Sequence, residues 1–151
     1  MLNQMMDNFM VTYRVKNTPV TADSMKGTIQ LMLDEVNETV EEVIDTEGKP
    51  LETINVPALA KEMADVIYVT AQRMRRMGFD VDAILTETHR SNMTKTVALA
   101  DAKAELDIAR ERYPSASIVE GTRDAVLRCT DTGKVIKPTC YTPANITKEM
   151  I

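Results

Sequence analysis

The sequence predicts a mainly α-helical bundle of four to five helices that ends in a short β-hairpin and an irregular tail. Apolar residues recur every three or four positions through most of the first 113 residues, which is typical of amphipathic helices. Aromatic residues make up only 4% of the chain and methionine occurs eleven times, a composition that favours helix-on-helix packing. We therefore expect a helical domain over residues 1–113, with residues 114–151 packed on it as an extension.

The first half of the chain predicts a short helix and then a long one. The short helix covers residues 6–15 and ends before Pro19, and Thr21 or Asp23 can cap the next helix. In residues 25–44 the apolar positions are separated by three or four residues, a strong helical pattern. Residues 45–57 contain one glycine and two prolines, so we expect them to connect two helices.

The second half predicts further helices and one hairpin. A helix over residues 59–77 ends at Gly78, and Asp80 can cap a third helix. A fourth helical pattern runs through residues 99–113 and ends before a proline. Residues 125–138 predict a hairpin that turns at positions 131–133, and the tail at 141–151 is expected to be irregular.

Charge and composition exclude some functions and locations. The net charge is −5 and the pI is about 5.0, so we expect no nucleic-acid partner and no anionic membrane partner. No signal peptide or apolar membrane span is visible, which indicates a cytoplasmic protein. Cys129 and Cys140 are then expected to be reduced, with a disulfide between them as the alternative.

Two pairs of acidic residues suggest a metal site. Glu35 and Glu38 project from one side of the first long helix, beside its apolar stripe. Glu62 and Asp65 have the same three-residue spacing and the same position beside the stripe of the next long helix. If the helices pack through their stripes, the four carboxylates converge and repel one another unless a cation is bound. Because all the ligands are oxygens, Mg²⁺ is the expected cation and Mn²⁺ a substitute.

These segments resemble a known enzyme superfamily. The stretches DEVNE at residues 34–38, EMAD at 62–65 and HRSNMTK at 89–95 are similar to motifs of the all-α nucleoside triphosphate pyrophosphohydrolases. That superfamily includes MazG-like proteins, dimeric dUTPases and phosphoribosyl-ATP pyrophosphohydrolases. The C-terminal stretch DTGKVIKPTCYTPANI resembles a tail of phage and bacterial members. Asp34 departs from the usual first glutamate, but it points away from the acidic cluster.

The resemblance implies a reaction and a set of residues. An NTP or dNTP would be cleaved between its α and β phosphates to give a monophosphate and pyrophosphate, in nucleotide-pool housecleaning. Glu38 or Glu35 would orient or deprotonate the attacking water, Lys95 would bind a phosphate, and Asn92 would bind the sugar or a phosphate. The resemblance also implies a homo-oligomer, a dimer or a dimer of dimers. It implies that the metal ligands are Glu35, Glu38, Glu62 and Asp65.

Several alternatives stay open at this stage. His89, the only histidine, is either a structural residue or a substrate contact. The substrate can instead be phosphoribosyl-ATP, and the non-enzymatic alternative is a helical dimeric interaction protein. A di-iron bundle needs two Glu-x-x-His motifs and a P-loop enzyme needs a Walker A motif, and the sequence contains neither.

Overall fold

The computed structural model describes residues 1–46, 48–50, 53 and 55–151, so part of the predicted connection at 45–57 lies outside the described residues. The described residues form five α-helices and a small antiparallel sheet, which confirms the mainly α prediction. They divide into two compact units: residues 1–83 with 147–151, and residues 84–146. Among the described residues, none of the helices combines the length and the apolarity needed to cross a bilayer.

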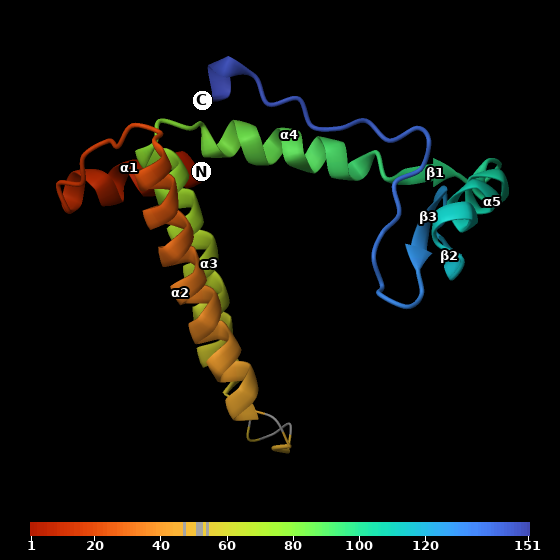
Figure 1. The fold of residues 1–151 in the computed structure, drawn as a ribbon, viewed down its shortest axis with the longest axis horizontal. Coiled ribbons are helices and arrows are strands. Elements are labelled where there is room, and N and C mark those ends of the chain that lie inside the picture. The colour runs from red at the N-terminus through yellow and green to blue at the C-terminus, as the bar shows by residue number, and fades with distance from the viewer. Residues whose placement is uncertain (47, 51–52, 54) are drawn as a thin grey trace. The chain divides into compact units, whose positions relative to one another are not determined.

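The first unit is built on a helical hairpin. Helix α2 (Ala22–Thr46) and helix α3 (Val56–Arg76) lie side by side and run in opposite directions (Figure 1). The Thr21 hydroxyl oxygen accepts a hydrogen bond from the Ser24 amide at 3.1 Å, which confirms Thr21 as the cap of α2. Gly78 ends α3 with a φ of 93°, a conformation that favours glycine.

Helix α1 (Leu2–Thr12) packs against α3. Met6 is fully buried there with Ala71 and Val81. The helix begins at Leu2 rather than at the predicted residue 6, because the Asp82 carboxylate accepts a hydrogen bond from the Leu2 amide at 2.9 Å. This carboxylate satisfies one of the amides that the first turn of a helix leaves free.

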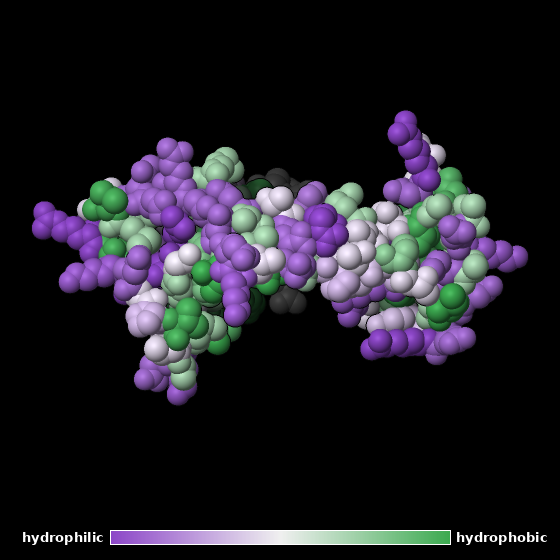
Figure 2. Space-filling model, turned by 90° about the horizontal axis from the view of Figure 1, so that it is seen from above, coloured by the Kyte–Doolittle hydropathy of each residue, from purple (hydrophilic) through white to green (hydrophobic). Residues whose placement is uncertain are grey.

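The apolar stripe of α2 is not buried within the chain, contrary to prediction. Val36, Val40 and Val43 are 40%, 45% and 51% exposed. The reason is that α2 has α3 as its main neighbour, and one neighbour covers only part of a helix surface. Hydrophobic residues accordingly reach the molecular surface among hydrophilic ones, as the green and purple atoms of Figure 2 show.

The second unit combines most of helix α4 (Val81–Met93), from residue 84 on, with helix α5 (Ala102–Arg112) and a sheet. Strands β1 (Thr96–Ala98), β2 (Ala116–Glu120) and β3 (Asp124–Cys129) pair antiparallel in the order β1-β3-β2. Helix α5 covers the sheet and buries a core with it. That core includes Leu106, Ala109, Ala116, Leu127, Cys129 and Ile136.

Asp80 caps α4 as predicted, because its carboxylate accepts the Ala83 amide at 2.9 Å. The helix predicted over 99–113 starts only at Ala102, because residues 99–101 form a turn in which the Asp101 amide donates to the Ala98 carbonyl at 2.9 Å. The sequence did not predict β2. The turn at 131–133 is confirmed by the hydrogen bond from the Gly133 amide to the Cys129 carbonyl (2.8 Å), but only Arg128 and Val135 form a bridge beyond it in the described chain.

The C-terminal tail is irregular through residue 146, as predicted, and this part follows α4 within the second unit. Its end is not wholly irregular, because a short 3₁₀ helix, η2 (Lys148–Met150), forms within the first unit. The buried Ser91 side chain lies 2.9 Å from the Thr142 carbonyl and 3.1 Å from the Tyr141 hydroxyl. The Glu87 carboxylate accepts the Asn145 amide at 2.8 Å. Cys129 and Cys140 are both free thiols.

Candidate functional site

Three of the four predicted acidic residues come together on the α2–α3 hairpin. Glu35 of α2 and Glu62 and Asp65 of α3 each offer a carboxylate oxygen, and these oxygens all lie within 4.8 Å of one another. The three-residue spacing places Glu62 and Asp65 on one face of α3, next to α2. The Glu62 side chain is 13% exposed and the Asp65 side chain 38%, so the cluster is open to solvent on one side.

The fourth acidic residue, Glu38, is exposed at the border of this cluster. Its pKa is raised, chiefly by the charge of Glu35 and then by desolvation and the charge of Glu62. The raised pKa indicates that the negative charge of the cluster exceeds the positive charge that Lys61 supplies. Asp34 points away from the cluster, as predicted, and its carboxylate accepts a hydrogen bond from the side-chain amide of Gln30 at 2.8 Å.

Lys61 belongs to the cluster, although the sequence did not predict it. Its ammonium nitrogen lies 3.0 Å from Glu62 Oε1 and 3.0 Å from Asp65 Oδ2. Hydrogen bonds to Asp65 and Glu62 raise the pKa of Lys61 above its usual value. The four-residue spacing of Lys61 and Asp65 is a signal that could have identified this ion pair.

The cluster suits a divalent cation. Ligands of one octahedral Mg²⁺ ion are about 3.0–4.2 Å apart at a Mg–O distance of about 2.1 Å, and the three carboxylate oxygens, all within 4.8 Å of one another, can reach that range by small side-chain movements. The ligands are all oxygens, which hard cations prefer. The Lys61 ammonium already occupies the position of a positive charge between Glu62 and Asp65, so the site attracts a cation.

The predicted substrate-binding residues lie in the second unit. Lys95 donates a hydrogen bond from its ammonium nitrogen to Asn92 Oδ1 at 2.6 Å, so these two residues are neighbours. His89 is exposed on α4. Their roles toward a substrate stay predictions.

Lys95 also lines a basic pocket of about 330 Å³ within the second unit. Its other basic lining residues are Arg112, Lys134 and Lys137. Lys137 lies over the Tyr141 ring at 4.5 Å from the ring centre, and Arg112 lies over the Tyr113 ring at 5.5 Å. Lys95, the residue predicted to bind a phosphate, is therefore one of four basic residues that line this pocket.

Comparison with known protein families decides the relationship. A family model described as phosphoribosyl-ATP pyrophosphohydrolase matches residues 4–92, more than half of the chain. The chain belongs to the phosphoribosyl-ATP pyrophosphohydrolase family. This family is part of the MazG-like all-α NTP pyrophosphohydrolase superfamily, so the predicted resemblance is confirmed. The chain is a hydrolase that acts on phosphoric anhydride bonds, and its substrate is of the nucleotide type.

The family match includes the whole acidic cluster and ends within α4, at residue 92. Enzymes of the phosphoribosyl-ATP pyrophosphohydrolase family typically depend on a divalent metal, in keeping with the cluster. The match also favours the phosphoribosyl-ATP alternative over the broader expectation of an NTP or dNTP. No curated protein matches the chain with significance.

Proposed function

We propose that the protein hydrolyses a phosphoribosyl-ATP-like nucleotide between its α and β phosphates, with the acidic cluster of α2 and α3 as its metal site. The observation that carries the proposal is the convergence of Glu35, Glu62 and Asp65 within the matched region. A divalent cation such as Mg²⁺ or Mn²⁺, when bound, neutralises phosphate charge and lowers the pKa of a coordinated water.

The carboxylates have two roles in this proposal, binding the cation and activating the attacking water. Glu35, Glu62 and Asp65 hold the cation, and Glu38 completes the set from the border of the cluster. Glu38 or Glu35 orients the attacking water and accepts its proton. The raised pKa of Glu38 suits the role of the base, because a carboxylate with a higher pKa takes a proton more readily. The oxygen of the water bonds to the α-phosphorus and pyrophosphate leaves.

Lys61 has a role that its position suggests. In the absence of a divalent cation its ammonium compensates Glu62 and Asp65. When the cation binds, we expect Lys61 to release these carboxylates and to turn toward the substrate phosphates. Its side chain is 63% exposed and so has room to move.

The remaining substrate contacts are proposed from the second unit. Lys95 binds a phosphate as a point charge, Asn92 binds the sugar or a phosphate, and His89 is a further substrate contact. The pairing of Lys95 with Asn92 makes a joint contact with one ligand reasonable. We place the reaction in the cytoplasm, in keeping with the free thiols of Cys129 and Cys140.

We also propose a homo-oligomer formed through the apolar face of the α2–α3 hairpin. This face carries a groove of about 360 Å³ lined by Val36, Thr39, Val40, Met63, Val66 and Ile67. Ile67 is 62% exposed and Met63 55%, and contiguous exposed apolar residues of this kind mark interaction surfaces. Because Val36 and Met63 are next to Glu35 and Glu62 in sequence, a second copy on this face would border the acidic cluster.

A substrate screen tests the proposed function. Phosphoribosyl-ATP, the common NTPs and the common dNTPs are each supplied with Mg²⁺, and pyrophosphate release is measured. We expect the highest kcat/KM with phosphoribosyl-ATP and no release when EDTA replaces Mg²⁺. Faster hydrolysis of an NTP or dNTP would support the housecleaning reaction instead. Release of orthophosphate alone, or hydrolysis undiminished by EDTA, would contradict the proposed reaction.

A further inference from the structure

A pocket lies where α2 begins and α3 ends. Its volume is about 200 Å³, and it is formed by the start of α2, the end of α3 and the segment before α2. Arg73 is eight residues beyond Asp65 on α3, which places it about 12 Å from the acidic cluster along the helix. The polar and small residues that line the pocket are Thr18, Ser24, Gly27, Thr28, Arg73 and Arg76.

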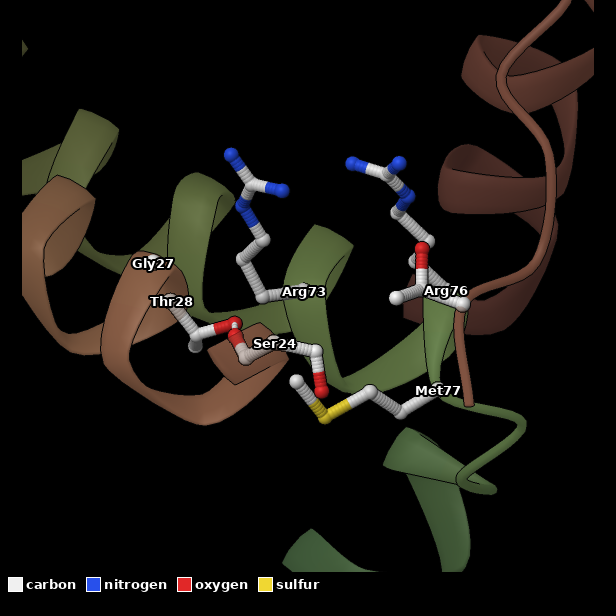
Figure 3. A pocket seen from close by; sticks show the side chains of 7 residues that line it. Ser24, Gly27, Thr28, Arg73, Arg76 and Met77 are labelled. Atoms are coloured by element: carbon white, nitrogen blue, oxygen red, sulfur yellow. Dashed lines mark hydrogen bonds between the residues drawn. The ribbon is translucent and has the colours of Figure 1, made fainter. Parts of the chain in front are cut away.

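The two arginines of this pocket are not compensated by acidic residues. Arg75, which lies between them in α3, pairs with the Asp7 carboxylate at 2.7 Å. Within the described part of the chain, neither Arg73 nor Arg76 has a carboxylate at ion-pairing distance. Figure 3 shows their guanidinium groups side by side and extending in the same direction from α3. Two neighbouring cations repel each other, so an anion bound between them would be stabilised by both.

Arg73 also has a buried hydrogen-bond donor. Its Nε atom is buried and has no hydrogen-bond partner among the described residues. Burial, and after it the charge of Arg76, lowers the pKa of Arg73. A buried donor without a partner costs free energy in a native protein, so a ligand that accepts a hydrogen bond from this atom would be stabilised here.

The hydroxyl groups of the pocket do not neutralise the two arginines, because they bond to backbone carbonyls. Ser24 Oγ lies 2.8 Å from the Pro19 carbonyl, and Thr28 Oγ1 donates to the Ser24 carbonyl at 2.9 Å. The Arg76 Nε atom donates to the Lys16 carbonyl at 3.0 Å, which fixes the side chain and leaves its terminal nitrogens at the pocket. Adjacent guanidinium groups with free N–H donors match the several oxygens of a phosphate group.

An apolar pocket adjoins the two arginines. Its volume is about 370 Å³, and Arg73 and Arg76 line it as well. Phe9 and Tyr68 line this second pocket, and their rings contact each other edge to face with centres 5.8 Å apart. Leu31 and Val69 add aliphatic surface. Aromatic and aliphatic walls next to a phosphate site suit a ligand that carries a planar ring.

We propose that Arg73 and Arg76 bind the phosphate group of a nucleoside monophosphate whose base lies against Phe9 and Tyr68. The two arginines of this binding site are at least about 12 Å from the acidic cluster along α3, and the site needs no metal. The inference goes beyond the proposed hydrolysis and does not depend on it.

Isothermal titration calorimetry on the full chain in EDTA tests this site. EDTA removes the divalent cations that the acidic cluster needs to attract phosphate, so binding in EDTA reports on the arginine pocket alone. The probes are AMP and inorganic phosphate at constant ionic strength. We expect both to bind, and AMP to bind several-fold more tightly because only AMP has a ring for the apolar pocket.

Matched variants assign the binding to the arginines. Arg73→Gln and Arg76→Gln should each weaken AMP binding by about 10- to 100-fold, the range for loss of charge-assisted hydrogen bonds. Arg75→Gln makes the same charge change on the same helix outside the pocket, and it should leave AMP affinity within about threefold. Arg73→Lys retains the charge but removes Nε, so its affinity should fall between those of wild type and Arg73→Gln.

Four results would overturn the proposal. The first is a wild-type protein that binds neither probe, and the second is an Arg75→Gln variant that weakens AMP binding as strongly as Arg73→Gln does. Equal affinities for AMP and inorganic phosphate would remove the role of the apolar pocket. A change of oligomeric state in Arg73→Gln, without any AMP binding by the wild type, would assign the arginines to a subunit contact. Circular dichroism of each variant separates loss of binding from loss of fold.

Discussion

Replacing Lys61 with methionine should strengthen Mg²⁺ binding. The Lys61 ammonium lies 3.0 Å from carboxylate oxygens of both Glu62 and Asp65, so it competes with a metal for the same ligands. Methionine keeps a long apolar stem and removes the charge. Because the lysine side chain is 63% exposed, solvent screens both ion pairs, and we expect Mg²⁺ affinity to rise by about two- to tenfold.

The same substitution should change the thermal stability in two ways. Without metal, the melting temperature of Lys61→Met should fall below that of the wild type, because the repelling carboxylates lose their cation. With saturating Mg²⁺, the increase in melting temperature should be larger than in the wild type. Differential scanning calorimetry over a series of Mg²⁺ concentrations measures both effects and the apparent Kd.

Lys26→Met is the matched control for this experiment. Lys26 is on the same hairpin, its side chain is 80% exposed, and its ammonium nitrogen lies 4.0 Å from the Asp23 carboxylate. It makes the same charge change away from the cluster, and we expect no change in Mg²⁺ affinity. The reasoning is refuted if Lys61→Met binds Mg²⁺ more weakly than the wild type, or if both variants change its affinity equally.

Three further predictions concern assembly and stability. Ile67→Glu places a charge on the exposed apolar face and should lower the molar mass in light scattering at unchanged helix content; a monomeric wild type would contradict the proposed oligomer. Hydrogen bonds from Arg90 and Asn145 lower the pKa of Glu87 to about 2 from 4.5, so its stabilising effect is complete above pH 4.5 and is lost as the pH falls toward 2. Glu87→Gln should therefore flatten acid unfolding followed by circular dichroism, and an unchanged pH profile would argue against this role. Leu127 is 1% exposed, and Leu127→Ala should lower the free energy of unfolding by about 2–5 kcal/mol in denaturant titrations, whereas a loss below about 1 kcal/mol would show a loosely packed core.

The helices could be predicted because their signals are local. The spacing of apolar residues located α2 and α3, and the caps at Thr21 and Asp80 act within three residues of themselves. The acidic cluster followed from the same periodicity, because equal angles beside two apolar stripes bring side chains together when the helices pair. Glu35, Glu62 and Asp65 are as close as this reasoning requires.

The features that the sequence did not reveal depend on distant partners. Strand β1 is only three residues long and is defined by its pairing with β3, about thirty positions later in the chain. The exposure of Val36 and Val40 reflects how few helices surround α2, which periodicity alone cannot show. Lys61 is the exception, because its two carboxylate partners are on its own helix and its four-residue spacing from Asp65 is a local signal.

The most direct test of the central claim is the rate of pyrophosphate release from phosphoribosyl-ATP by Glu62→Gln in saturating Mg²⁺. The Glu62 side chain is 13% exposed, compared with 38% for Asp65, so Glu62 lies deeper in the cluster. Glutamine keeps the shape of this side chain and removes its charge. Glu41→Gln, an exposed residue of α2 outside the cluster, is the matched control. We predict that kcat/KM falls by about 100-fold or more in Glu62→Gln and stays within about twofold in Glu41→Gln. Equal rates for Glu62→Gln and the wild type would contradict the assignment of the acidic cluster as the catalytic site.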